Sequence, residues 1–115
     1  MRADQVPLCP RCGAVARPNI LMFGDYGWIE ERTRRQRECF NRFLTEQNGR
    51  RIVVVELGAG TAIPTVRAAS ERIGGFAKAR VIRINPREPQ ISAPHIPLPC
   101  GALEGLRGIA QHLPS

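Results

Sequence analysis

The chain has 115 residues, of which 43% are hydrophobic, and a formal net charge of +7 at pH 7. This length and apolar content suit one packed domain and argue against both a disordered chain and two complete domains. No apolar run approaches the ~20 residues of a membrane-spanning helix, and the N-terminus lacks the apolar stretch of a secretory signal. A cytoplasmic protein without a membrane partner is therefore expected, and the basic charge favours an anionic ligand.

The turn-rich segment 1–18 contains two cysteines separated by two residues, Cys9 and Cys12, followed by Gly13. Two such thiolates can bind one tetrahedral Zn²⁺, and a glycine after the second lets backbone N–H groups turn toward sulfur. Because a structural zinc site needs four ligands, the segment predicts only half of a zinc knuckle. A redox-active pair is the competing interpretation, although such pairs usually open a helix after a strand.

One strand and one long helix are expected next. The apolar run Asn19–Phe23 is typical of a short strand, and Gly24–Gly27 of a turn. Trp28–Gln47 contains neither Pro nor Gly, which predicts a helix whose intermixed Arg and Glu form a solvated face. Cys39 in this helix is expected to be a buried small residue, and so is Cys100 further along. The predicted apolar stripe of the helix consists of Ile29, Gln36, Phe40, Phe43 and Leu44.

The second half of the chain alternates between strands and helices. Arg51–Leu57 is almost continuously apolar, which is typical of a strand buried on both faces. Alternation of this kind predicts a parallel sheet with helices on its faces, here an α/β, partial Rossmann-like domain over residues 19–115 with one open sheet edge. The further elements expected are a helix at Pro64–Ile73, strands at Ala79–Ile84 and His95–Leu98, and a closing helix at Gly101–Leu113 whose stripe is Leu103, Leu106, Ile109, Ala110 and Leu113.

Two polar or glycine-rich segments follow successive predicted strands. Gly58-Ala59-Gly60 comes directly after the first, where glycines allow a phosphate to approach the backbone and the next helix offers free N–H groups. Asn85 follows the second strand, where nucleotide-binding sheets place a side chain on the ribose hydroxyls. Each signal alone is equally compatible with a tight turn or a strand terminator, but ligands of such folds bind at this edge.

Together these segments resemble the sirtuin family of NAD-dependent protein deacylases. The most specific part runs from the Cys pair through Arg17-Pro18 to Phe23-Gly24-Asp25, similar to the family's second zinc Cys pair and its Arg-Pro and Phe-Gly-Glu strand. The remaining similar segments are Val53–Pro64, Val81–Asn85 and His95–Leu106. By position the resemblance implies Cys9 and Cys12 as zinc ligands, Phe23 and Gly24 as the wall for the acyl-lysine peptide, Gly58, Ala59 and Gly60 around the NAD ribose-phosphate, Asn85 on the adenosine ribose and Cys100 beside the adenine.

The chain also departs from the family pattern. Asp25 stands where Glu is usual, and Gly58-Ala59-Gly60 replaces Gly-Thr-Ser. The family's N-terminal portion has no counterpart here, including its glycine-rich turn, its first zinc Cys pair and its catalytic His, which neither His95 nor His112 matches.

The resemblance implies transfer of an acyl group from lysine to the ADP-ribose of NAD. The chain is expected to be the C-terminal portion of such a deacylase, inactive alone, with a complementary N-terminal sirtuin half or a second copy as partner. Two alternatives remain: a small basic zinc-knuckle module that binds nucleic acid, disfavoured by the scarcity of aromatic residues, and a non-catalytic remnant or subunit of a split enzyme.

Overall fold

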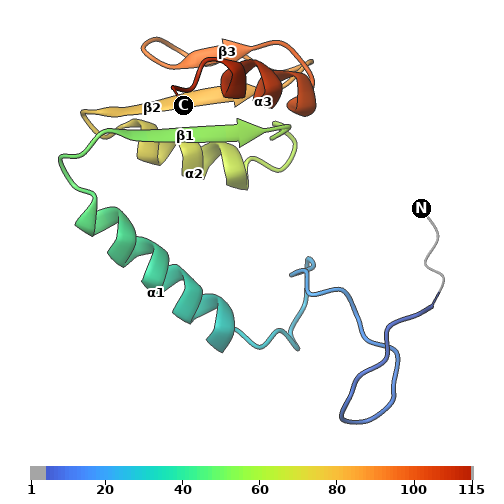
Figure 1. The fold of residues 1–115 in the computed structure, drawn as a ribbon. Helices are drawn as coiled ribbons and strands as arrows, with labels where there is room; N and C mark the ends of the chain where they lie inside the picture. The colour runs from blue at the N-terminus through green and yellow to red at the C-terminus, as the bar shows by residue number, and fades with distance from the viewer. Residues whose placement is uncertain (1–4, 115) are drawn as a thin grey trace. The chain divides into compact units, whose positions relative to one another are not determined.

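A computed structural model describes residues 5–114 of the chain. The chain divides into two compact units, Met1–Glu38 and Cys39–Ser115, and the boundary between them lies inside a long helix. None of the helices in the described residues is long and apolar enough to cross a lipid bilayer. The elements shown in Figure 1 are α1 (Glu31–Glu46), β1 (Ile52–Leu57), α2 (Thr65–Gly74), β2 (Ala79–Ile84), β3 (Ile96–Leu98) and α3 (Ala102–Gln111).

The backbone of the first unit turns tightly around the Cys pair. Residues Asn19–Phe23 do not form a strand, so the prediction of a strand there is wrong. Its backbone pairing in the described residues is an isolated antiparallel bridge between Leu8 and Val15. A strand needs a neighbour for its backbone N–H and C=O groups, and the nearby backbone bond of this run is a local turn, in which the Ile20 N–H donates to the Pro18 carbonyl at 2.8 Å. Local apolarity therefore did not suffice to make a strand.

Helix α1 is confirmed but begins later than predicted, at Glu31 instead of Trp28. Its solvated face carries ion pairs spaced four residues apart, such as Arg34–Glu38 at 2.9 Å. Of the predicted apolar stripe, Leu44 is buried, whereas Ile29 and the two phenylalanines are exposed. Cys39 is exposed as well, contrary to expectation. A helical stripe is buried only where another element covers it, and Leu44 shares a hollow with residues of α2 and its C-terminal turn.

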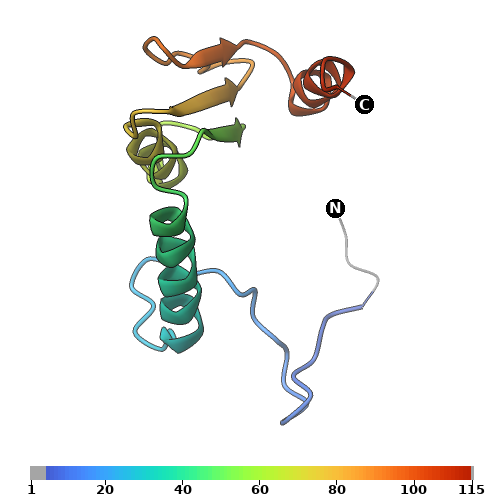
Figure 2. The same cartoon turned by 60° about the vertical axis from the view of Figure 1, so that its left-hand side comes forward.

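The predicted parallel α/β sheet is confirmed, with the strand order β1-β2-β3. Strand β1 pairs with β2 along its whole length, and β2 pairs with β3 over three residues. Helices α2 and α3 lie on opposite faces of the sheet (Figures 1 and 2). Two glycines permit this packing: a Cβ on Gly74 would come within 2.8 Å of Val81, and a Cβ on Gly105 within 2.8 Å of Ile84.

Strand β1 is an edge strand, not the doubly covered central strand that its apolarity predicted. Val53, Val55 and Leu57 point to the face that α2 does not cover and are 42–59% exposed. The predicted stripe of α3 is likewise exposed at Leu103 and Leu106, whereas Gly105 is the buried residue of this helix and lies against Ile84 of β2. The apolar sequence of a segment shows which side chains a neighbour could bury, not that such a neighbour is present. Among the described residues, no element covers these side chains of β1 and α3.

An ion pair lies inside the sheet–helix layer on the α2 face. The Arg83 guanidinium donates to both carboxylate oxygens of Glu56, at 2.5 and 3.2 Å, and to Glu71 at 2.9 Å. Both Glu56 and Arg83 are at most 2% exposed. These hydrogen bonds, and most of all those that Glu56 accepts, raise the pKa of Arg83 above its usual value. The pair thus links β1 to β2 through side chains as well as backbone.

Candidate nucleotide-binding edge

The carboxyl ends of the three strands lie side by side, and the segments predicted to bind NAD follow them. The Gly58 N–H donates to the Ile84 carbonyl at 2.9 Å, which ties the loop after β1 to the end of β2. The Asn85 N–H donates in the same way to the Leu98 carbonyl of β3 at 3.1 Å. Gly58, Ala59, Gly60 and Asn85 therefore belong to one edge of the sheet, with Cys100 two residues beyond the end of β3.

The loop after β1 depends on its first glycine. Gly58 has a φ of 63°, in the left-handed region where a side chain is strained, and an added Cβ would meet no atom within 4 Å. Backbone conformation, and not crowding, thus explains a glycine at this position. The loop turns from β1 toward α2, whose first residue is Thr65.

Asn85 holds this loop from the neighbouring strand. The residue is buried, with only 5% of its surface exposed, and its Nδ2 donates to the Ala59 carbonyl at 3.1 Å. Its Oδ1 accepts from the N–H groups of Arg87 and Glu88 at 2.9 and 3.0 Å. Asn85 therefore positions both loops of the edge, a role that the prediction of a ribose contact did not include.

Sequence reasoning missed two charged residues at this edge. Arg67, in α2, is buried and donates to the Ala59 carbonyl at 3.0 Å and to the Glu88 carbonyl. The Glu88 carboxylate accepts from the hydroxyl and the N–H of Thr61, at 2.5 and 3.2 Å. These bonds, the one from the Thr61 hydroxyl first, lower the pKa of Glu88. An acidic residue shortly after a strand end is a recognisable nucleotide-site signal, whereas nothing in the sequence marks Arg67.

Cys100 packs against the last helix. Its backbone N–H donates to the Leu98 carbonyl at 2.9 Å. Its thiol lies beside Gly105, where an added Cβ would come within 3.2 Å of the sulfur. The residue is half-buried and has a free thiol. Its side chain thus serves the contact between α3 and the strand end.

In the first unit, Cys9 and Cys12 form a compact turn. The Gly13 N–H donates to the Cys9 carbonyl at 2.9 Å, and Gly13 has a φ of 69°. The backbone N–H groups of Arg11 and Cys12 donate to the Cys9 sulfur, which lowers the pKa of that thiol. Such N–H···S bonds stabilise a thiolate, the form that binds metal.

The described residues do not complete the predicted zinc site. Two thiols fit two of the four positions that a structural zinc requires. Among residues 5–114, no group of three or more Cys, His, Asp or Glu side chains could hold a metal ion.

Phe23 and Gly24, predicted to face an acyl-lysine peptide, lie in a turn of the first unit. Phe23 is 96% exposed, and Gly24 has a φ of 72°. The turn is fastened by Arg17, which donates to the Asp25 carboxylate at 2.6 Å and lies 6.0 Å from the Trp28 ring centroid. The pair with Arg17 gives Asp25 a structural role and lowers the pKa of its carboxyl group.

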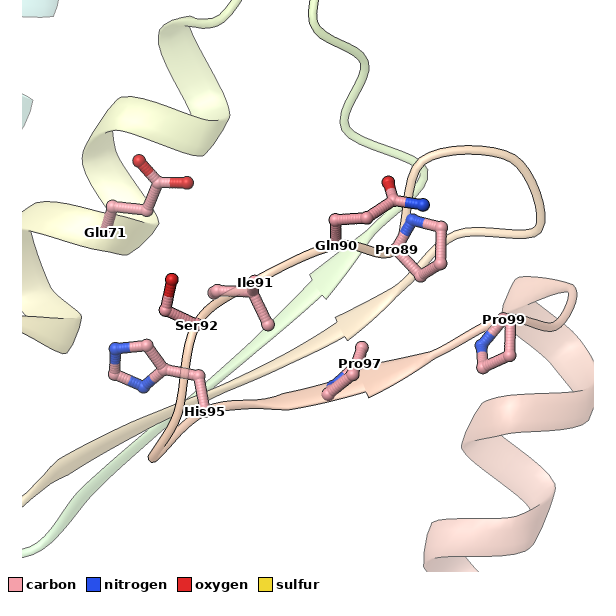
Figure 3. Close-up of a pocket in the computed structure, with 8 residues that line it drawn as sticks. All are labelled: Glu71, Pro89, Gln90, Ile91, Ser92, His95, Pro97 and Pro99. Atoms are coloured by element: carbon pink, nitrogen blue, oxygen red, sulfur yellow. The ribbon is translucent and has the colours of Figure 1, made fainter.

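A cavity of about 750 Å³ lies elsewhere, along β3 and the proline-rich segment before it (Figure 3). Its ionisable side chains already have partners: Glu71 pairs with Arg83, and His95 Nδ1 accepts from the Val81 N–H at 3.3 Å. The rest of the lining is Pro89, Gln90, Ile91, Ser92, Pro97 and Pro99. The cavity contains none of the predicted site residues and presents no free acid–base pair.

In comparisons with known proteins, no family model, curated protein or solved structure matches the chain.

Proposed function

We propose that this chain is the C-terminal, NAD-binding portion of a sirtuin-like protein lysine deacylase with a Rossmann-like sheet. The observation that carries the proposal is the convergence of the Gly58–Gly60 loop and Asn85 at the carboxyl edge of a parallel sheet. Parallel α/β sheets bind nucleotides at this edge, where loops and a helix N-terminus present backbone N–H groups. The resemblance of the sequence to sirtuins supplies the identity of the nucleotide.

In this proposal each part of the edge has a task. The left-handed turn at Gly58 lets the backbone approach the ribose-phosphate portion of NAD. Asn85 and Arg67 keep the loop in place because both donate hydrogen bonds to the Ala59 carbonyl. Cys100 and the start of α3 border the adenine. The Cys9–Cys12 turn contributes two thiolates to a shared zinc site, and the Phe23–Gly24 turn contributes to the peptide surface.

The open edge of β1 supports a second contributor to the site. The outer N–H and C=O groups of β1 have no partner strand among residues 5–114, and three of its apolar side chains are 42–59% exposed. Such an edge favours a neighbouring strand. We propose that a complementary sirtuin segment outside these 115 residues pairs here and supplies the catalytic His and the opposite wall. Neither histidine of the chain lies at this edge, since His95 directly precedes the start of β3 and His112 follows the C-terminal end of α3.

The test is an NMR titration with NAD that follows the backbone amides of the chain. NAD enclosed on one side is expected to bind weakly, with a Kd in the millimolar range, because few buried contacts offset its lost freedom. The largest shifts are expected at Gly58–Thr61, Asn85 and Cys100. Gly58→Ala is expected to weaken binding roughly tenfold through a distorted loop.

Gly49→Ala is the matched control, because Gly49 also has a positive φ, of 78°, and also meets no atom near an added Cβ. Both variants introduce the same kind of strain, but only Gly58 lies at the proposed site. Shifts centred away from the sheet edge, or equal losses of affinity in both variants, would contradict the proposal.

A further inference from the structure

A cluster of cationic side chains lies at the amino ends of β1 and β2, the edge of the sheet opposite to the proposed NAD site (Figure 1). The side chains come from the turn before β1 and from the start of β2, segments that are distant in the sequence and adjacent in the sheet. This basic cluster consists of Arg50, Arg51, Lys78 and Arg80. All four residues are exposed, and they line one surface hollow of about 630 Å³.

The basic cluster has no acidic partner among the described residues. None of its side chains takes part in the salt bridges of this part of the chain. Gly49 and Ala77 complete the lining of the hollow, so no carboxylate faces it. Arg80 donates a hydrogen bond to the Ala79 carbonyl at 2.7 Å, which leaves its charge uncompensated. Like charges on neighbouring strands destabilise a sheet, and a bound anion would remove this repulsion.

The shape and composition of the cluster favour an anion that carries many charges. A small anion in an open hollow stays mostly in water and gains little from exposed cations. A nucleic acid duplex presents one negative charge per ~1.7 Å of its axis and releases condensed counterions when cations neutralise its phosphates. Three of the four side chains are arginines, whose guanidinium groups can donate two parallel hydrogen bonds to one phosphate. The net charge of +7 adds a favourable long-range field.

We propose that the basic cluster is a binding site for the phosphate backbone of a double-stranded nucleic acid. The site lies at the opposite edge of the sheet from the Gly58 loop and does not depend on NAD binding. Aromatic residues make up only 5% of the chain, which disfavours binding through bases stacked on side chains. A duplex needs no such stacking, because its bases are already paired and stacked. Contacts to phosphates alone make the binding independent of base sequence.

Fluorescence anisotropy with a labelled DNA duplex of mixed sequence measures the Kd and its dependence on salt. Phosphate contacts from four cations predict that log K falls against log salt concentration with a slope of about −3 to −4. Arg50→Gln with Arg51→Gln is expected to weaken binding at low salt at least about tenfold and to reduce the slope by about 2. Arg34→Gln with Arg35→Gln is the matched control, because it removes the same charge from exposed arginines that pair with carboxylates of α1. This control is expected to keep the wild-type Kd and slope.

Lys78→Gln with Arg80→Gln removes the other two cations and provides a second variant if the first does not fold. Its expected loss of affinity and change of slope are of the same size. Equal losses in the cluster variants and the α1 control, or no loss in either cluster variant, overturn the proposal.

Two competitors complete the experiment at constant ionic strength. Millimolar NAD is expected to leave duplex binding unchanged, because its proposed site lies at the opposite edge of the sheet; displacement of the duplex by NAD overturns the proposal of a separate site. A polyglutamate peptide is expected to compete poorly. If the peptide binds the wild-type chain as tightly as the duplex does, the cluster is a site for acidic proteins and the proposal is overturned.

Discussion

Single residues at the sheet edge show where sequence reasoning reaches its limit. Gly58 and Asn85 were identified because a glycine after a strand and a polar residue before proline are local signals. Glu88 and Arg67 were missed because their roles depend on contacts across 27 and 21 positions of sequence. Asn85 was predicted as a ribose contact. In the structure its buried amide donates to the Ala59 carbonyl and so holds the loop that was predicted to bind the ligand.

The buried pair Glu56–Arg83 allows a stability prediction. Glu56→Gln leaves the buried Arg83 guanidinium with the exposed Glu71 carboxylate as its one charged partner among those described. The free energy of unfolding in urea is therefore expected to fall by about 3–5 kcal/mol. Glu71→Gln is the control: it removes the other carboxylate on Arg83, but that side chain is 54% exposed. Its expected loss is about 0–1 kcal/mol.

Replacing the pair as a whole distinguishes charge burial from packing. In Glu56→Leu with Arg83→Met, no buried charge is left unpaired, and the double variant is expected to be more stable than Glu56→Gln. Equal losses of stability in Glu56→Gln and Glu71→Gln would show that the buried pair with Glu56 matters no more to Arg83 than the exposed pair with Glu71.

Elements were predicted best where neighbours within the chain complete them. The strand Ala79–Ile84 was predicted to the residue, and it is the strand that is paired on both sides. Asn19–Phe23 is not a strand, and β1 has no partner strand on its outer side among the described residues. Apolar composition alone does not show whether a neighbouring strand is present. The zinc half-site stays a prediction from the cysteine spacing; the structure contains the turn that Gly13 favours, with the backbone N–H groups of Arg11 and Cys12 lowering the pKa of Cys9.

The Cys9–Cys12 turn predicts incomplete zinc binding. Two thiolates fill two of four positions, so less than one tightly held zinc per chain is expected in native mass spectrometry, with one zinc per two chains as the fullest state. Cys9→Ser is expected to abolish this binding, whereas Cys39→Ser, at an exposed free thiol, is expected to leave it intact. One zinc per single chain that resists a chelator would contradict the half-site.

The open edge of β1 predicts self-association at high concentration. Val53 is 59% exposed on a strand whose outer N–H and C=O groups have no partner strand among the described residues. Val53→Lys places a charge on this edge and is expected to reduce light scattering at high protein concentration. Val66→Lys is the matched control, because Val66 is 57% exposed on α2 and receives the same charge. Equal effects of both substitutions would attribute the change to net charge and not to the strand.

For the whole molecule, few hydrophobic residues are buried and many apolar side chains are exposed, which favours a binding partner. The buried hydrophobic residues of the described chain are Leu44, Ile73, Ala79, Val81 and Ile84. Large apolar side chains of β1 and α3, such as Val55 and Leu106, remain more than 40% exposed. A core this limited gives marginal stability, which a partner that binds the folded state raises by mass action.

The last prediction concerns catalysis by the chain alone and with its proposed partner. Without a general base to activate the ribose hydroxyl, a step worth ~10²–10⁴-fold, the lone chain is expected to release no nicotinamide from NAD and an acetylated peptide. Addition of a sirtuin N-terminal segment carrying the catalytic His and the glycine-rich turn is expected to tighten NAD binding and to restore nicotinamide release. The same addition to Val53→Lys is expected to fail, because the charged edge cannot pair, whereas Val66→Lys is expected to be restored like the wild type. Micromolar NAD affinity of the lone chain by calorimetry, lost in Asn85→Ala, would instead show that these 115 residues close a nucleotide site unaided.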